Sequence, residues 1–117
     1  MAFMLLIQEP VGQRETRTEA EGQAAYDSML KFADELKSRG ILRGVESLAS
    51  QAKAMRVTVR EGRSQILDGP FAEAKEMIGG FFVVDCATQA EAVEIAAQCP
   101  AAAWCTIEVR SLGPCYT

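Results

Sequence analysis

The sequence predicts an α+β domain in which two helices lie against a sheet of four or five strands. Three observations predict this architecture. Apolar residues recur at helical spacing in two segments and as short or alternating runs elsewhere, in the order β-α-β(β)-β-α-β. Each helical segment opens with a capping box, which marks its N-terminus. The length of 117 residues is that of one domain, so we expect a single domain over residues 1–117.

Composition and charge exclude several classes of protein. The chain is 49% hydrophobic and 24% charged, as in an ordinary globular domain. Its net charge of −4 lacks the basic footprint of a nucleic-acid-binding protein. No apolar run approaches the roughly 20 residues of a membrane helix, and the start, MAFMLLIQEP, lacks the basic region of a secretory signal. We therefore expect a cytoplasmic protein with no nucleic-acid or membrane partner.

The chain has four cysteines and no histidine. None of the cysteines (Cys86, Cys99, Cys105 and Cys115) forms a C-x-x-C pair, so we expect reduced thiols and no zinc or redox motif. The absence of histidine removes the commonest metal ligand and the side chain that titrates nearest neutral pH. We expect no metal and no cofactor, and any acid–base chemistry must use Asp, Glu, Lys, Tyr or Cys.

The first third of the chain predicts a strand, a loop and a long helix. Residues 2–7 are apolar on both faces and predict a buried strand, and residues 11–17 form a polar loop. Thr18 and Glu21 open the helix as a capping box, and Gly40 ends it. Tyr26 falls on the inward stripe of this helix, so we expect it in the core with its hydroxyl bonded to a partner.

A hairpin is predicted in the middle of the chain, after a short irregular strand over residues 41–48 and a loop over residues 49–54. Hydrophobic residues alternate with polar ones over residues 55–60, which predicts a half-buried strand. Glu61-Gly62 turns the chain into residues 64–67. A two-residue turn would set Arg60 opposite Arg63, which favours a longer loop.

The stretch over residues 66–84 carries three signals. Asp68-Gly69-Pro70 is a compact turn. Residues 72–77, AEAKEM, are good helix formers ended by Gly79-Gly80, which predicts a short helical stretch. The glycine pair allows close backbone packing or a bulge, and it lacks the context of a phosphate-binding loop. Residues 78–85 predict the most apolar strand.

The last third of the chain predicts a helix and a strand. Thr88 and Glu91 form the second capping box, and Pro100 stops the helix. Apolar and polar residues then alternate over residues 105–110, as in a strand with one buried face.

A second copy of the chain is the simplest cover for the face of the sheet that the helices leave open. Two helices can cover one face only, yet residues 2–7 and 81–84 are apolar on both faces. We therefore expect a homodimer in which the open sheet faces meet.

Several segments together resemble a known family. They are MLLI at the start, AAYDSMLKFADEL and GILRGVESL, then LDGPFAEAKEMIGGFFVVD, AEAVEIAAQCPAA and TIEVR. This combination resembles the DGPF branch of the YCII-related domain family over nearly the whole chain. The resemblance implies a ferredoxin-like fold with an antiparallel sheet that pairs into a dimeric α/β barrel.

The functional implications of the resemblance are narrower. Many members of the family have no assigned activity, and some are proposed to be enzymes with a His–Asp pair whose histidine lies on the first helix. The corresponding region near residues 26–28 holds no histidine, so that pair cannot be carried over. The resemblance also implies a transcription-related protein partner.

Asp68 is the candidate catalytic residue, with two interpretations. In one it faces a pocket of the dimer barrel as a base. In the other its carboxylate accepts backbone N–H bonds and closes the turn, which would make it a poorer base.

The other candidate ligand-binding residues fall into two groups. Phe71 is an apolar anchor or pocket wall, and Glu73 and Lys75 form part of either a site or a solvated face. Tyr26, Arg43 and Glu46 form the second group, in which the arginine is either a clamp for a carboxylate or phosphate or a surface ion-pair partner.

Two functions remain open from the sequence. One is a non-catalytic dimer that binds a small ligand or a regulatory protein in or near the barrel. The alternative is an enzyme acting on a small organic substrate by carboxylate acid–base chemistry, with Asp68 as the base and Arg43 or Lys75 orienting an anionic substrate.

Overall fold

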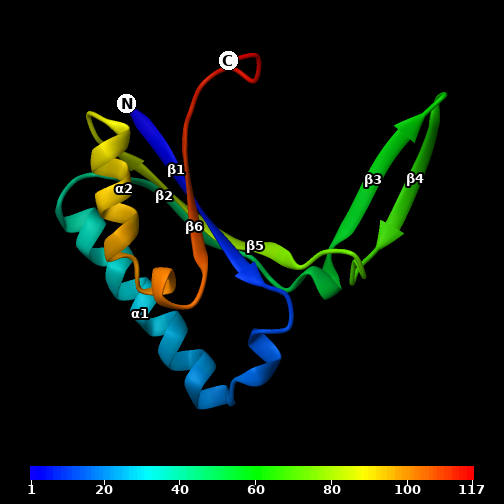
Figure 1. Ribbon diagram of the computed structural model, residues 1–117, viewed down its shortest axis with the longest axis horizontal. Coiled ribbons are helices and arrows are strands. Elements are labelled where there is room, and N and C mark those ends of the chain that lie inside the picture. Colours follow the sequence, from blue (N-terminus) through cyan, green and yellow to red (C-terminus); the bar gives the residue numbers. More distant parts are fainter.

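The computed structural model describes residues 1–117 as a four-stranded sheet, two α-helices and a separate two-stranded arm (Figure 1). The strands are β1 (Ala2–Pro10), β2 (Leu42–Ser47), β3 (Met55–Arg60), β4 (Arg63–Asp68), β5 (Glu76–Asp85) and β6 (Thr106–Ser111). The helices are α1 (Glu19–Ser38) and α2 (Gln89–Gln98), and short 3-10 turns lie at Arg14–Thr16, Gln51–Lys53 and Pro100–Ala103. The predicted α+β class is confirmed. Neither α-helix combines the length and the apolar character needed to cross a membrane.

The main sheet has the strand order β2-β5-β1-β6, and every pair in it is antiparallel. This arrangement, with one helix after β1 and one after β5, is compatible with a ferredoxin-like fold. The central strands β1 and β5 alternate buried and half-buried residues, because successive side chains point to opposite faces.

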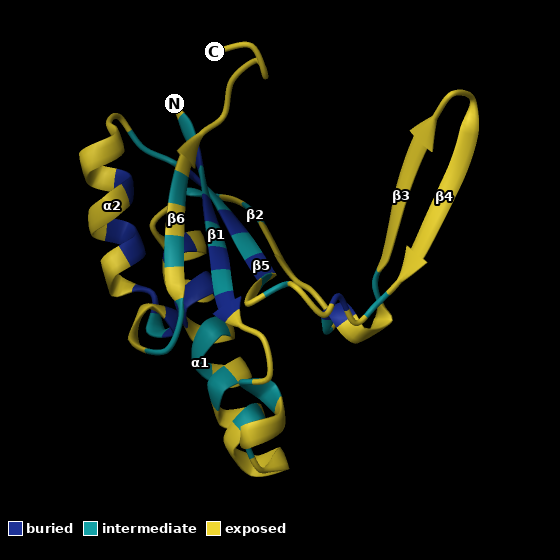
Figure 2. Cartoon of the chain, turned by 45° about the vertical axis from the view of Figure 1, so that its right-hand side comes forward, coloured by how far each residue is buried: buried dark blue, intermediate teal, exposed yellow.

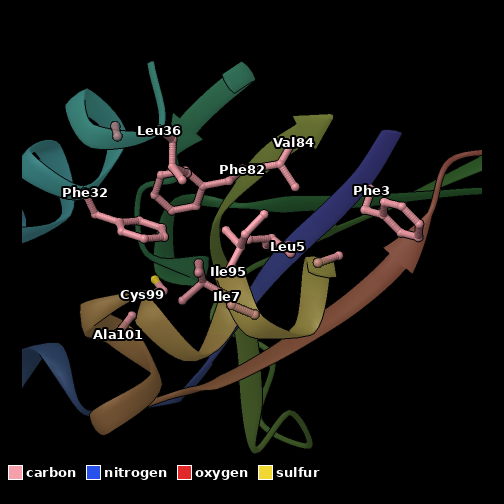
Figure 3. Packing of buried hydrophobic residues seen from close by; sticks show 13 residues of the cluster. Phe3, Leu5, Ile7, Phe32, Leu36, Phe82, Val84, Ile95, Cys99 and Ala101 are labelled. Carbon is pink, nitrogen blue, oxygen red and sulfur yellow. The ribbon is translucent and has the colours of Figure 1, made fainter. Parts of the chain in front are cut away.

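Both helices cover the same face of the sheet. Side chains from β1 and β5 that point to this face, such as Leu5 and Phe82, form one buried cluster with residues of α1 and α2 (Figure 3). Phe32 of α1 meets Phe82 edge to face, with ring centroids 5.2 Å apart. The opposite face of the sheet carries apolar side chains that no other element of the chain covers.

The helix signals in the sequence are confirmed at α1 and in part at α2. The Thr18 hydroxyl accepts a bond from the Glu21 N–H at 3.1 Å, and the Thr18 N–H donates to the Glu21 carboxylate at 2.8 Å. α1 ends before Gly40, whose φ of 73° is the left-handed conformation that glycine tolerates. At α2, Thr88 accepts from the Glu91 N–H at 3.2 Å, but the Glu91 carboxylate accepts from the Ala87 N–H at 3.0 Å, so only half of the predicted second capping box is formed.

The hairpin is confirmed, but its predicted burial and its predicted loop are wrong. Every residue from position 55 to position 68 is exposed, because the hairpin projects from the rest of the chain as an arm (Figures 1 and 2). Its loop is the two residues Glu61 and Gly62, with φ values of 53° and 76°. Positive φ at both positions gives a turn whose twist matches that of the strands. Arg60 and Arg63 do pair across it, and their exposure allows solvent to screen the repulsion.

The helical stretch expected over residues 72–77 is not formed. This segment is a turn and a bend, and β5 begins at Glu76, where it pairs with Pro10 at the end of β1. Six residues are too few to hold a helix by propensity alone, so pairing with β1 determines the conformation of this segment.

Candidate ligand-binding pocket

A pocket of about 450 Å³ opens between α1 and the sheet, and we call it the α1 pocket. Its walls come from β1, α1, β2, β5 and the segment before β6, and 13 of its 22 lining residues are hydrophobic. A concave, mainly apolar space with a few polar groups is the usual form of a small-molecule site.

The polar end of the α1 pocket is an ion pair between Glu9 and Arg14. Arg14 Nε donates to Glu9 Oε2 at 2.9 Å, and Arg14 Nη2 donates to Glu9 Oε1 at 2.7 Å. Glu9 is only 6% exposed. The hydrogen bond to Glu9 raises the pKa of Arg14. Two parallel charge-assisted bonds hold the guanidinium in one orientation within the pocket.

Gly79 and Gly80 make room for this ion pair. A Cβ atom on Gly79 would overlap the Glu9 carboxylate, and one on Gly80 would press against the backbone of β2. The pairing of β1 with β5 shifts register here, since Ile7 pairs with Gly80 and Gln8 with Ile78. The predicted roles of the glycine pair, close packing and a bulge, are both confirmed.

Gln13, Arg17 and Trp104 form the next part of the wall. Gln13 Nε2 donates to the Trp104 carbonyl at 2.7 Å, which ties the loop after β1 to the segment before β6. The Arg17 guanidinium lies 5.5 Å from the centre of the Trp104 ring, a cation–π contact. The pocket therefore has two arginines, one fixed by a carboxylate and one held against an aromatic ring.

Cys105 also lines the α1 pocket but is a poor nucleophile. Burial, followed by the nearby charge of Glu9, raises the pKa of its thiol to about 11. Its Sγ donates a weak bond to the Gln13 side-chain oxygen at 3.6 Å. Since the thiolate is the reactive form, this cysteine is a wall of the pocket at neutral pH.

Two of the candidate residues named from the sequence, Tyr26 and Glu46, line the α1 pocket. The expectation that Tyr26 is a core residue is wrong, because its side chain is 47% exposed. It lies on the side of α1 that faces the pocket, together with Met29 and Leu30. The helical spacing predicted the correct face of α1. That face borders the open pocket, so its side chains stay partly exposed.

Arg43 lies outside the α1 pocket, on β2. Its Nη2 donates to Asp85 Oδ2 at 2.7 Å and its Nη1 donates to the Gly40 carbonyl at 3.2 Å. The bond from Arg43 lowers the pKa of Asp85. Within one chain this arginine is thus the partner of a surface ion pair.

The remaining candidates lie at the base of the arm. Asp68 ends β4 opposite Met55, and its exposed carboxylate accepts no hydrogen bond and forms no ion pair within the chain. Phe71 is buried, as expected of an anchor, and the Arg56 guanidinium lies 3.7 Å from the centre of its ring. Glu73 and Lys75 are exposed. Within one chain Asp68 forms no ion pair with Arg43 or Lys75, the two cations of the enzyme hypothesis, and Arg43 pairs with Asp85 instead.

Sequence reasoning missed the polar end of the α1 pocket, although one signal for it was present. The alternation that buries Phe3, Leu5 and Ile7 places Glu9 on the same face. A carboxylate on a core-facing position needs a partner, and Arg14 in the following loop is the first arginine after it. Gln13, Arg17 and Trp104 carried no comparable pattern.

A YCII-related domain model matches residues 1–114. The chain belongs to the YCII-related domain family. It is also 39% identical over 57 residues to an uncharacterized protein of Rhizobium meliloti (strain 1021). That match covers 49% of this YCII-related domain and 46% of the relative, so the chain spans about half the length of the protein it matches.

Proposed function

We propose that this YCII-related domain binds a small organic molecule in the α1 pocket. The supporting observation is the bidentate Glu9–Arg14 pair at the end of an otherwise mainly apolar space of about 450 Å³. An ion pair that is largely withdrawn from water, as this one is on its glutamate side, contributes little more to folding than apolar side chains of similar volume. Its position at the pocket is therefore better explained by recognition than by stability.

The ligand is a molecule with an apolar body and a hydrogen-bond acceptor, such as a carboxylate, at one end. Arg14 uses Nε and Nη2 on Glu9, while its Nη1 bonds no group of the protein. Arg17 supplies a second cation at the same wall. Tyr26 and Leu30 supply an apolar surface for the body of the ligand.

Trp104 provides a direct test, because it is the single tryptophan of the chain and lines the α1 pocket. The intrinsic fluorescence of the protein would be titrated with a set of small aromatic and aliphatic carboxylic acids and with the matching primary alcohols. We expect a saturable change with at least one acid and a weaker response to the corresponding alcohol. No response to any acid at millimolar concentration would contradict the proposal.

Two neighbouring alanines of α1 offer matched variants. Ala25 lines the pocket, so Ala25→Phe fills part of it and should abolish the fluorescence response. Ala24 is exposed and lies outside the pocket, so Ala24→Phe should leave the response unchanged. Binding that survives Ala25→Phe would place the ligand elsewhere.

We also propose that the domain acts as a homodimer joined through the open face of the sheet, as a dimeric α/β barrel. Met4 and Leu6 of β1 pair with Val83 and Phe81 of β5, and all four point away from the helices. A stripe of large apolar side chains with no covering element favours a self-complementary interface.

Light scattering and sedimentation equilibrium test the homodimer. Leu6→Arg places a charge in the proposed interface, opposite Glu108 of the same chain, so the monomer should stay folded and the dimer should dissociate. Val93→Arg introduces the same charge at an exposed position of α2 and serves as the control. A wild-type protein that is monomeric at micromolar concentration would overturn the homodimer.

Two expectations from the sequence stay predictions. The transcription-related protein partner is one. The enzyme with Asp68 as its base is the other, and it requires a substrate-binding cation near this carboxylate.

A further inference from the structure

The arm formed by β3 and β4 has no cover on either of its faces. All residues from position 55 to position 68 are exposed, and Figure 2 shows the hairpin standing clear of the rest of the molecule. A two-stranded hairpin without a third layer is marginally stable in water at best. Some surface must therefore support the arm in the working protein.

The arm has an apolar face and a polar face. The strand register places Met55, Val57, Val59 and Ile66 on one face, since Val57 pairs with Ile66. These four side chains are between 56% and 67% exposed. The other face carries Thr58 and Gln65, which also pair with each other, the arginines of the arm, and Leu67 opposite Arg56. The first face holds four large apolar residues beside Ser64 and Asp68, and the second holds one, so the first is closer in composition to a buried contact.

The base of the arm is fixed, so the direction in which it projects is defined. The Gly69 N–H donates to the Ala54 carbonyl at 2.8 Å, and a Cβ on Gly69 would overlap the backbone at Gln51. Phe71 is buried at the same base, under Arg56. The arm is thus held at its base, and its apolar face is exposed.

The exposed area of the chain indicates how large the missing cover is. The chain exposes 8064 Å², whereas a compact monomer of 12.7 kDa exposes roughly 6,200 Å², which leaves an excess of about 1,800 Å². Its radius of gyration of 16.0 Å likewise exceeds the value of about 13 Å for a compact chain of this length. An excess of this size per chain is that of an obligate dimer, and it is larger than the half-share of a standard interface.

We propose that the arm packs its apolar face, Met55, Val57, Val59 and Ile66, against a second copy of this chain. This inference rests on the homodimer of the proposed function and adds a second contact outside the sheet. The four apolar side chains of the open sheet face are too few to account for an excess of about 1,800 Å². The arm carries five further large hydrophobic residues that the chain leaves exposed, Met55, Val57, Val59, Ile66 and Leu67. In a symmetric dimer each copy offers the same arm, so the contact is formed twice.

Two adjacent cross-strand pairs of the arm give a matched test. The double variant Val57→Asp/Ile66→Asp places two charges on the apolar face, and Thr58→Asp/Gln65→Asp places two charges on the polar face one step along the strands. Both variants set two carboxylates opposite each other, so any weakening of the hairpin itself is common to both. Sedimentation equilibrium would measure the dissociation constant of the dimer for each.

We expect the apolar-face variant to raise the dissociation constant by about 100-fold or more and the polar-face variant to raise it by less than about threefold. Equal effects of the two variants, or no effect of either, would overturn the contact of the apolar face. A dimer that dissociates with Leu6→Arg and withstands Val57→Asp/Ile66→Asp would overturn the role of the arm while the sheet-face homodimer stands. A monomeric wild type would overturn both.

Hydrogen exchange supplies a second measurement that needs no substitution in the arm. Amides of residues 55–68 should be protected in the dimer and should lose that protection in the Leu6→Arg monomer. Unprotected arm amides in the dimer would mean that another molecule covers the arm. Amides that stay protected in the monomer would mean that the arm folds onto its own chain. Either result overturns the proposal.

Discussion

At the scale of single residues, Gly79 is the position where the smallest change should matter most. Gly79→Ala would drive a methyl group into the buried Glu9 carboxylate and force the ion pair with Arg14 to move. We expect the free energy of unfolding to fall by about 1–3 kcal/mol, the usual cost of overpacking. Urea denaturation measures the loss, and the fluorescence titration should show weaker ligand binding as well.

Gly22 supplies the control, because the same substitution there should have the opposite sign. Gly22 lies inside α1, and a Cβ at this position would meet no atom within 4 Å. Gly22→Ala should raise the free energy of unfolding by about 0.5–1 kcal/mol through the higher helix propensity of alanine. If both substitutions lowered the free energy of unfolding, the loss at Gly79 could not be assigned to the overlap with the Glu9 carboxylate.

The α1 pocket could be predicted only in part, and the reason lies in individual residues. Helical periodicity is local, so it placed Tyr26 on the correct face of α1. The pairing of Glu9 with Arg14 depends on the loop after β1 folding back over the strand end, which no local pattern specifies. The turn motif marked Asp68 as a candidate site residue. In the structure Asp68 ends β4 of the projecting arm and does not line the α1 pocket.

At the scale of elements, the capping box of α1 makes a prediction about pH. Bonds from Thr18 to the Glu21 carboxylate lower the pKa of this glutamate below its ordinary value of 4.5. A carboxyl with a lowered pKa in the folded state stabilises the fold above its ordinary pKa, and this contribution is lost as the pH falls through the lowered value.

Thr18→Ala should therefore lower the free energy of unfolding by about 1 kcal/mol at neutral pH, the usual cost of losing such a cap. The bond to the Glu21 carboxylate comes from the backbone N–H of residue 18, which Thr18→Ala keeps. The pH-dependent part therefore belongs to Glu21→Gln, whose deficit relative to wild type should shrink as the pH falls below 4.5, where wild-type Glu21 becomes protonated in the unfolded chain and then in the folded one. Thr18→Ser keeps the hydroxyl and serves as the control. Thermal unfolding from pH 7 to pH 3 measures all three variants, and a Glu21→Gln deficit that does not change with pH would contradict the role of Glu21.

Elements with strong local signals were predictable, and elements decided by tertiary pairing were not. The two capped helices and the apolar strands β1 and β5 lie close to where their patterns place them. Residues 72–77 have the composition of a helix, but β5 begins within them because β1 supplies a strand to pair with. The alternation in β3 correctly indicates a two-faced strand. The alternation cannot show that no element of this chain covers the apolar face of the strand.

At the scale of the whole molecule, the chain consists of a packed body and an uncovered arm. Its extents of 46 × 42 × 18 Å describe a flat body whose arm lies in the same plane, beyond the sheet (Figure 1). All the members of the main buried cluster belong to β1, β5, the helices and the segment after α2. Stability within one chain should therefore come from the body alone.

This division predicts opposite consequences for two apolar truncations. Leu36 of α1 is fully buried between the helix and the sheet, so Leu36→Ala should lower the free energy of unfolding by about 2–5 kcal/mol. Val59 of the arm is 56% exposed, so Val59→Ala should change it by less than about 0.5 kcal/mol. Both would be made in the Leu6→Arg background and compared by urea denaturation, so that association does not enter the measurement. A large loss with Val59→Ala in that background would show that the arm packs on its own body, and the stability of one chain would then no longer reside in the body alone.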